Sequence, residues 1–345
     1  MAAKLRGALI GCGFFAQNHL NAWRDLAQDV DLVAVCDMDK AKAEAAAAKF
    51  GVPKVHTDAA AMFAAERPDF VDIVTTMPSH KALVLLAASH RVPTIVQKPF
   101  APTWQECVDM VEACRDAGVP LMVHENFRFQ APMLAIADLL KQGVLGDLTW
   151  ARLTWRTNYD VYAGQPYLSK EKLFILLDLG IHVLDLARVF MGEVERLSCE
   201  TQSLKPGIAG EDMATVMLRH TSGTVSVVDC TYEAKRDPDP FPETLLEIEG
   251  RRGSLVLGPG LRLEITSDRV TTTRDLSTPL LGWTSHPWHV AQESVLNTQR
   301  HWVECLRQGR EPATSGADNL KTYALVMAAY EAARTHGSVR PASWP

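Results

Sequence analysis

The chain has 345 residues, 47% of them hydrophobic and 22% charged, which is typical of a folded protein large enough for two domains. Its formal net charge of −6 argues against nucleic-acid or anionic-membrane partners, which require clustered Lys and Arg. The seven cysteines are scattered without a C-x-x-C pair, and no apolar run approaches the roughly 18 residues of a membrane helix. We therefore expect free thiols and a cytoplasmic protein.

Residues 1–125 alternate short apolar runs with helical patterns. The expected strands are residues 5–10, 30–36, 54–55, 70–75, 94–97 and 121–124. The expected helices are residues 16–27, 39–50, 57–66, 80–89 and 103–117, with Thr57 or Asp58 as the cap of the third. Continuous apolar strands alternating with helices indicate a parallel sheet covered on both faces. We predict an α/β fold that begins with a doubly wound parallel sheet.

Residues 126–345 follow a different pattern. Extended segments are expected over residues 148–157, 244–249, 254–257 and 262–273, with a hairpin over residues 212–232. Helices are expected over residues 133–142, 176–190, 293–308 and 317–335. Strands without interleaved helices favour antiparallel pairing. We therefore predict a second, α+β domain with an open, mainly antiparallel sheet.

A glycine motif joins the first expected strand to the first helix. In Gly11-x-Gly13-x-x-Ala16, the first glycine permits a tight turn and the second lets the backbone approach a pyrophosphate. Backbone amides of Phe14 and Phe15 begin the helix, whose N-terminus favours phosphate. This pattern predicts a Rossmann domain over residues 1–125.

Asp37 ends the second expected strand, 21 residues after Ala16, where a carboxylate binds the adenosine ribose hydroxyls. The same carboxylate would repel a 2′-phosphate, so we predict NAD as the cofactor. Lys40 lies close enough in sequence to leave dual use of NAD and NADP open.

Polar side chains follow the fourth, fifth and sixth strands, whose carboxyl ends share the ligand-binding edge of the sheet. Those assigned to the cofactor are Thr76, Pro78, His80, Gln97 and Lys98. Lys98 is the strongest candidate for a functional residue among them, because a lysine at the end of a buried strand can point its ammonium group into the crevice. The alternative is a surface lysine that begins a loop.

The expected helix over residues 176–190 carries Asp178, His182 and Asp185. Positions i, i+4 and i+7 share one face of an α-helix. A carboxylate beside a histidine can orient the ring for acid–base work. We take Asp178 and His182 as catalytic candidates and expect Asp185 to pair or pack; the alternative is an ordinary ion pair within the helix.

Together these motifs resemble the glucose–fructose oxidoreductase / inositol dehydrogenase / MocA family over nearly the whole chain. The resemblance implies a Rossmann domain followed by a substrate domain over residues 126–345, whose sheet often packs against another subunit as a homodimer or homotetramer. It also implies a catalytic group of Lys98, Asp178 and His182. Sugar-site positions match Asn126, Arg128, Arg156, Asn158 and Tyr159.

Two residues depart from the family pattern. Gln97 stands where a glutamate is usual before Lys-Pro, so it can still bond a ribose hydroxyl but brings no negative charge to Lys98. Phe127 stands where many members carry arginine. Pro99 matches a proline that is often cis.

The implied reaction is oxidation of a sugar or polyol hydroxyl. A free imidazole has a pKa of about 6.5, whereas that of a lysine, about 10.4, must fall by about 3 units for it to act as a base near neutrality. We assign His182 as the base and Lys98 as the donor that holds the oxygen, with swapped roles left open. Residues 125–130 and 159–167 are similar to those of members that oxidise D-apiose, which implies oxidation of an aldose to its lactone.

Other functions remain open. Inositol or another polyol could be the substrate, and on this fold NAD-dependent glycosidases and non-catalytic dinucleotide-responsive regulators are alternatives. His286 and His289 have an H-x-x-H spacing, but no carboxylate or cysteine lies near in sequence. We therefore expect loop histidines and no metal.

Overall fold

The computed structural model describes residues 3–343, which divide into two compact units. The first comprises residues 3–126 with Ser294–Leu320, and the second Phe127–Glu293 with Lys321–Ser343. The chain therefore leaves the first unit next to the predicted boundary, and returns to it once before it ends in the second unit. Within the described residues, no helix combines the length and apolarity needed to cross a membrane.

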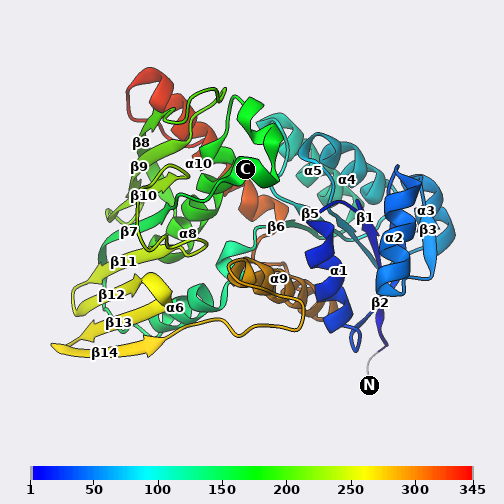
Figure 1. The fold of residues 1–345 in the computed structure, drawn as a ribbon, viewed down its shortest axis with the longest axis horizontal. Helices are drawn as coiled ribbons and strands as arrows, with labels where there is room; N and C mark the ends of the chain where they lie inside the picture. The colour runs from blue at the N-terminus through cyan, green and yellow to red at the C-terminus, as the bar shows by residue number, and fades with distance from the viewer. Residues whose placement is uncertain (1–2, 344–345) are drawn as a thin grey trace. The chain divides into compact units, whose positions relative to one another are not determined.

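Six parallel strands form the sheet of the first unit, in the order β3-β2-β1-β4-β5-β6. Figure 1 labels these strands except β4. Every residue of β4, β5 and β6 is buried, which requires cover on both faces. The predicted doubly wound parallel sheet is confirmed. The strands are β1 (Leu5–Ile10), β2 (Val30–Cys36), β3 (Lys54–His56), β4 (Phe70–Ile73), β5 (Thr94–Gln97) and β6 (Leu121–His124).

The strand order reverses between β1 and β4, which pair directly, with Ile10 opposite Ile73. In open parallel sheets this reversal separates the loops that follow the two strands and opens a crevice at their carboxyl ends. The glycine turn after β1 therefore lies at the ligand-binding edge.

Polar side chains begin three helices of the first unit. Asp39 caps α2 by accepting from Ala41 N, Asp58, one of the two predicted candidates, caps α3, and Thr103 caps α5. The core beneath includes the rings of Trp23, Phe70 and Trp302. The helices are α1 (Ala16–Asp25), α2 (Lys40–Phe50), α3 (Ala59–Glu66), α4 (His80–Ser89), α5 (Trp104–Ala117) and the later part of α9 (His289–Gln308).

Eight strands form the sheet of the second unit, in the order β14-β13-β12-β11-β7-β10-β9-β8. Neighbours are antiparallel except β7 and β10, which run parallel, so the predicted mainly antiparallel sheet is confirmed. The strands are β7 (Leu148–Arg156), β8 (Val194–Gln202), β9 (Met213–His220), β10 (Val225–Thr231), β11 (Leu245–Gly250), β12 (Gly253–Gly258), β13 (Arg262–Ser267) and β14 (Val270–Asp275).

Helices of the second unit are α6 (Ala131–Lys141), α7 (Val161–Gly164), α8 (Ile181–Met191) and the later part of α10 (Gly316–Thr335). The predicted helix over residues 176–190 begins instead with a π turn, Leu176–Gly180, which continues into α8. A π turn closes its hydrogen bonds over five residues. The single face expected for Asp178, His182 and Asp185 is therefore interrupted after Asp178.

Candidate active site

The glycine turn closes against the end of β4. Gly11 has φ +96°, and a Cβ added there would lie 2.6 Å from the carbonyl oxygen of Val74. Only glycine tolerates both the dihedral angle and the contact. A Cβ added at Gly13 would meet nothing within 4 Å. Among the described residues, nothing fills the space over Gly13, so a pyrophosphate could approach the backbone there.

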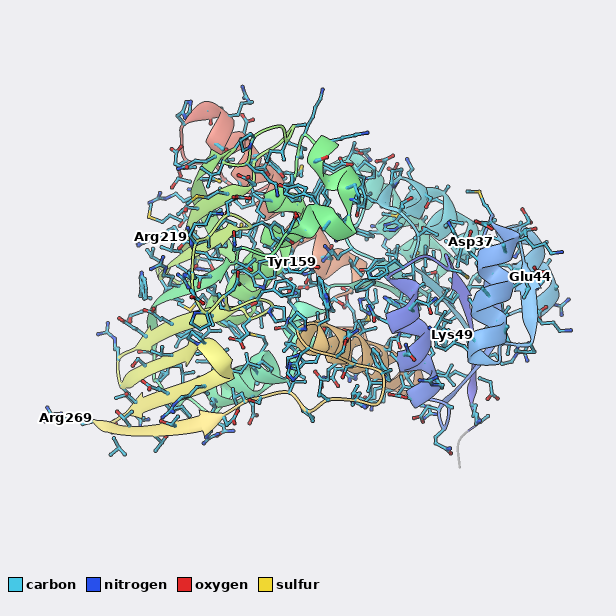
Figure 2. The ribbon with its side chains drawn as sticks, viewed as in Figure 1. Asp37, Glu44, Lys49, Tyr159, Arg219 and Arg269 are labelled. Atoms are coloured by element: carbon cyan, nitrogen blue, oxygen red, sulfur yellow. The ribbon has the colours of Figure 1, made fainter. Side chains whose placement is uncertain are left out.

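Asp37 ties the glycine turn to the end of β2 and is labelled in Figure 2. Its Oδ2 accepts from Cys12 N at 2.7 Å, and its Oδ1 accepts from Asp39 N at 2.8 Å. A carboxylate oxygen has more than one lone pair, so both can still accept from ribose hydroxyls. The residues present therefore fit a dinucleotide with a free 2′-hydroxyl.

The start of α1 suits an anion. Of the described residues, none caps this helix with a side chain and none in its first turn is acidic, so nothing there offsets its positive end. Phe14 is 87% exposed and Met38 94%. Each directly follows a residue of the predicted cofactor site, Gly13 and Asp37 respectively. Nothing in the sequence distinguishes Met38 except its place directly after Asp37.

His80 is buried beneath the loops that follow β4 and β5. Its Nδ1 lies 3.1 Å from the carbonyl oxygens of Pro99 and Phe100, and its Nε2 lies 3.1 Å from that of Thr75. Burial lowers the pKa of His80, although these carbonyls favour its charged form. The ring therefore joins the two loops from within. Thr76 and Pro78 lie in or beside the short 3₁₀ turn that precedes it, Met77–Ser79.

The end of β5 is held by Gln97. Its Oε1 accepts from Lys98 N at 2.7 Å, while its Nε2 lies 3.1 Å from Nε2 of His19. The His19 ring therefore accepts from Gln97 and donates through Nδ1 to Asp72 Oδ2 at 2.8 Å. The oxygen and the nitrogen of the Gln97 side-chain amide thus both have protein partners. The peptide bond between Lys98 and Pro99 is cis.

His19 was expected to be a structural histidine, and these contacts confirm it. Asp72 is fully buried in the middle of β4 and also accepts from the indole of Trp23 at 2.8 Å. Its Oδ2 therefore accepts from two ring N–H donors and also, at 3.4 Å, from the side-chain amide of Gln299. Sequence reasoning missed Asp72, whose only signal is an acidic residue inside an apolar strand.

In the second unit, Phe127 stacks flat on His182, with ring centroids 3.9 Å apart and an interplanar angle of 5°. His182 is almost fully buried in the first turn of α8. Asp178 lies in the π turn, where its Oδ2 accepts from the hydroxyl of Tyr232 at 3.4 Å. Burial raises the pKa of Tyr232, and the Asp178 charge adds to the shift. The tyrosine therefore stays a neutral donor beside Asp178.

Asp185 faces a different set of partners. Arg128 donates through Nε to Asp185 Oδ2 at 2.7 Å and through Nη2 to Oδ1, which also accepts from Thr322 at 2.7 Å. Burial opposes ionisation of Asp185, but Arg128, with Arg188, holds its pKa below the ordinary value. Asp185 therefore pairs, as expected. The guanidinium of Arg128, assigned to the sugar, forms a bidentate pair with it.

The other predicted sugar-site residues belong to different units. Asn126 belongs to the first unit, where it donates to Ser294 Oγ at 2.7 Å. Arg156 ends β7 in the second unit, and Asn158 follows it on a loop where its Oδ1 accepts from Lys235.

Tyr159 lies on the same loop (Figure 2). Its ring stacks on Phe241 with centroids 4.1 Å apart and meets Trp288 edge-on at 5.2 Å. Sequence reasoning missed this aromatic cluster, because Phe241 and Trp288 are distant in sequence.

His286 and His289 adjoin that cluster, with ring centroids 4.1 Å apart. Burial lowers the pKa of His289, and the neighbouring His286 lowers it further. Across residues 3–343, no three His, Cys, Asp or Glu side chains gather in a metal-binding group.

Comparison with known proteins places both units in one family. Residues 5–125 match the model of the oxidoreductase family with an NAD-binding Rossmann fold, and residues 133–256 match the GFO/IDH/MocA C-terminal domain. A D-apiose dehydrogenase of Paraburkholderia graminis is 51% identical over 331 residues, which cover 96% of this chain and 88% of the relative. One from Rhizobium rhizogenes is 49% identical, covering 96% and 95%.

Solved structures agree. An oxidoreductase from Agrobacterium radiobacter, in complex with NAD+, L-tartaric acid and magnesium, superposes with a TM-score of 0.96 at 48% identity over 98% of both chains. A levoglucosan dehydrogenase in complex with NADH has a TM-score of 0.86 at 20% identity, covering 99% of this chain and 100% of the other. The latter likeness concerns the fold.

The two glycines give a matched pair of alanine variants. Gly11→Ala strains the backbone and clashes with Val74, so we expect the melting temperature without ligand to fall by at least about 3 °C. Gly13→Ala has room, so we expect an unchanged melting temperature but NAD binding weakened at least about tenfold, or ~1.4 kcal/mol. Thermal unfolding and a fluorescence titration with NADH check both. Equal effects of the two variants on stability would contradict this account of the turn.

Proposed function

The chain belongs to the GFO/IDH/MocA family of NAD-binding oxidoreductases, and on that basis we propose that it oxidises an aldose, D-apiose, to its lactone. The observation that carries the substrate is the near-50% identity to two D-apiose dehydrogenases over almost the whole length. Inositol or another polyol is the alternative substrate class. Relatives named as inositol 2-dehydrogenases are about half as similar in sequence, at 26% and 25% identity.

We assign the cofactor to the glycine turn and its neighbours. Gly11 and Gly13 give backbone access, Phe14 and Phe15 supply amides, and Asp37 receives the ribose hydroxyls. Bound there, NAD supplies the hydride acceptor. The carboxylate of Asp37 disfavours a 2′-phosphate, so we propose a preference for NAD over NADP.

We assign the proton chemistry to Lys98, Asp178 and His182. His182 removes the proton of the sugar hydroxyl as the carbon loses its hydride, because an imidazole exchanges protons near neutral pH. Lys98 donates a hydrogen bond to the same oxygen, and Asp178 supports the charged imidazole. Phe127 favours this role for His182, since its flat stacking fixes the plane of the ring.

Two further assignments complete the proposal. The seven cysteines are free and buried, which fits a reducing compartment, so we place the enzyme in the cytoplasm. We also propose that the open sheet of the second unit joins two subunits. Its β9 strand buries Ala214, Val216 and Leu218 on one face and leaves Met217 51% exposed on the other.

The substrate assignment is tested with the wild-type enzyme on a panel of aldoses, polyols and inositols, with NAD and NADP. We expect NADH formation, followed by absorbance at 340 nm, to be fastest with D-apiose and NAD, and a lactone or its acid as product. Turnover confined to inositols would move the enzyme to the alternative class. The absence of turnover with every sugar would overturn the proposal.

The same assay tests the catalytic assignment through His182→Asn and Lys98→Met. General acid–base groups contribute about 10²- to 10⁴-fold to rate, so we expect each variant to lose at least about 100-fold in kcat. If His182→Asn turns over nearly as fast as the wild type, His182 is not the base.

The proposed subunit contact is tested with Met217→Lys. A lysine at position 217 would place a charge in the proposed contact between subunits, where its burial is costly. We therefore expect sedimentation or light scattering to show smaller particles than the wild type. Leu134→Lys is the matched control, because Leu134 is also well exposed, at 43%, but lies on α6 outside the sheet. The same oligomeric state in wild type and Met217→Lys would argue against an interface through β9.

A further inference from the structure

Four consecutive backbone N–H groups, two just before the π turn that carries Asp178 and two at its start, are bound in an unusual way. The first N–H groups of a helix have no partner within it and require outside acceptors. Here the N–H groups of residues 174–177 all find acceptors on two distant residues, Glu211 and Tyr330. The start of this helix is therefore fixed from outside its own sequence.

Glu211 takes three of the four groups. Its carboxylate accepts from Phe174 N at 3.2 Å and from Leu176 N at 3.2 Å, while its backbone carbonyl accepts from Ile175 N at 3.2 Å. Tyr330, on α10, donates its hydroxyl to Glu211 Oε1 at 2.8 Å and accepts from Leu177 N at 3.2 Å. Burial raises the pKa of Tyr330, and Glu211 raises it further. The hydroxyl therefore stays protonated and can donate.

The burial of this carboxylate is costly. Glu211 is 8% exposed, and among the described residues no Lys, Arg or His forms an ion pair with it. A buried carboxylate needs compensation, and here it comes from N–H and O–H donors at the positive end of a helix. A neutral capping residue could satisfy one or two of these N–H groups at lower cost. We call Glu211 and Tyr330 together the clamp. The use of a buried charged residue in the clamp indicates that the start of this helix must be held rigidly.

Rigidity at this point serves the next residue. Asp178 N donates to Phe174 O at 2.8 Å, so the clamped residue 174 sets where the helix places Asp178. The ring of Phe174 also lies parallel to that of Tyr232, which donates to the Asp178 carboxylate. We infer that Glu211 and Tyr330 are positioning residues, which hold the π turn so that Asp178 and His182 keep their reactive geometry. This inference rests on the proposed function for those two residues.

The test compares Glu211→Gln, Glu211→Ala and Tyr330→Phe. Small misplacements of reacting groups cost up to about 100-fold in rate. We expect kcat with D-apiose to fall about 10- to 100-fold in Glu211→Ala, less in Glu211→Gln, which keeps one acceptor oxygen, and about 3- to 10-fold in Tyr330→Phe. KM for NAD and for D-apiose should stay within about twofold, because the variants leave substrate binding intact.

Asp212→Asn is the matched control. Asp212 is the next residue and is also a buried carboxylate, but it accepts from the N–H groups of Leu204 and Lys205, away from the π turn. Its variant removes the same charge and tests simple destabilisation. We expect kcat, normalised to the NADH-binding sites present, to stay within about twofold of the wild type.

Hydrogen exchange supplies a readout that needs no turnover. Amides of residues 174–177 should exchange faster in Tyr330→Phe and Glu211→Gln than in the wild type, with those of β7 unchanged. If the wild type oxidised no sugar, the proposed function would fail. Hydrogen exchange would still show whether Glu211 and Tyr330 hold the start of the helix. The inference is overturned if exchange is unchanged, or if Asp212→Asn lowers normalised kcat as much as Glu211→Gln.

Discussion

The close approach of Gly11 to the end of β4 is the contact on which the first unit depends. With φ +96° and room for no side chain beside Val74, the chain turns at once from β1 into α1. That turn presents Cys12 N to Asp37 and leaves the space over Gly13 unfilled. A larger residue at position 11 would move the turn away from β4, and with it the backbone amides and the Asp37 carboxylate that we assign to the cofactor. One steric constraint therefore organises the whole nucleotide edge.

Buried carboxylates fix the segments around the candidate catalytic residues. Asp72 holds His19, which holds Gln97, whose oxygen accepts from the backbone of Lys98. Asp185 anchors α8 through its pair with Arg128, one turn after His182. Each carboxylate is compensated by several donors, as burial of a charge requires. The candidate catalytic residues thus lie on segments held by two buried carboxylates, Asp72 and Asp185, which are not themselves assigned to substrate or cofactor.

Much of the first unit follows from sequence, since its strands are continuous apolar runs between turn residues. Residues 5–10, 30–36, 94–97 and 121–124 are strands with the predicted bounds. The strand Val194–Gln202 was missed, because only Leu197 and Cys199 are buried on it. The π turn was missed as well, because local periodicity does not distinguish a widened turn from a regular helix.

The residues that hold the candidate catalytic residues in place were less predictable than the motifs themselves. Strand ends and spacing single out Lys98, Asp178 and His182, but the partners that hold them come from elsewhere in the chain. Glu211 and Tyr330 are 119 residues apart, and no local pattern couples them. The family resemblance identified the reaction class, whereas the hydrogen bonds that stabilise the site required coordinates.

The most direct test of a sugar dehydrogenase is the fate of the hydrogen on the oxidised carbon. Wild-type enzyme is mixed with NAD and D-apiose carrying deuterium at C1, and the nicotinamide product is examined by proton NMR. We predict deuterium at C4 of the NADH formed, in step with lactone production. NADH without deuterium, or labelled sugar returned without net NADH, would contradict oxidation at the anomeric carbon.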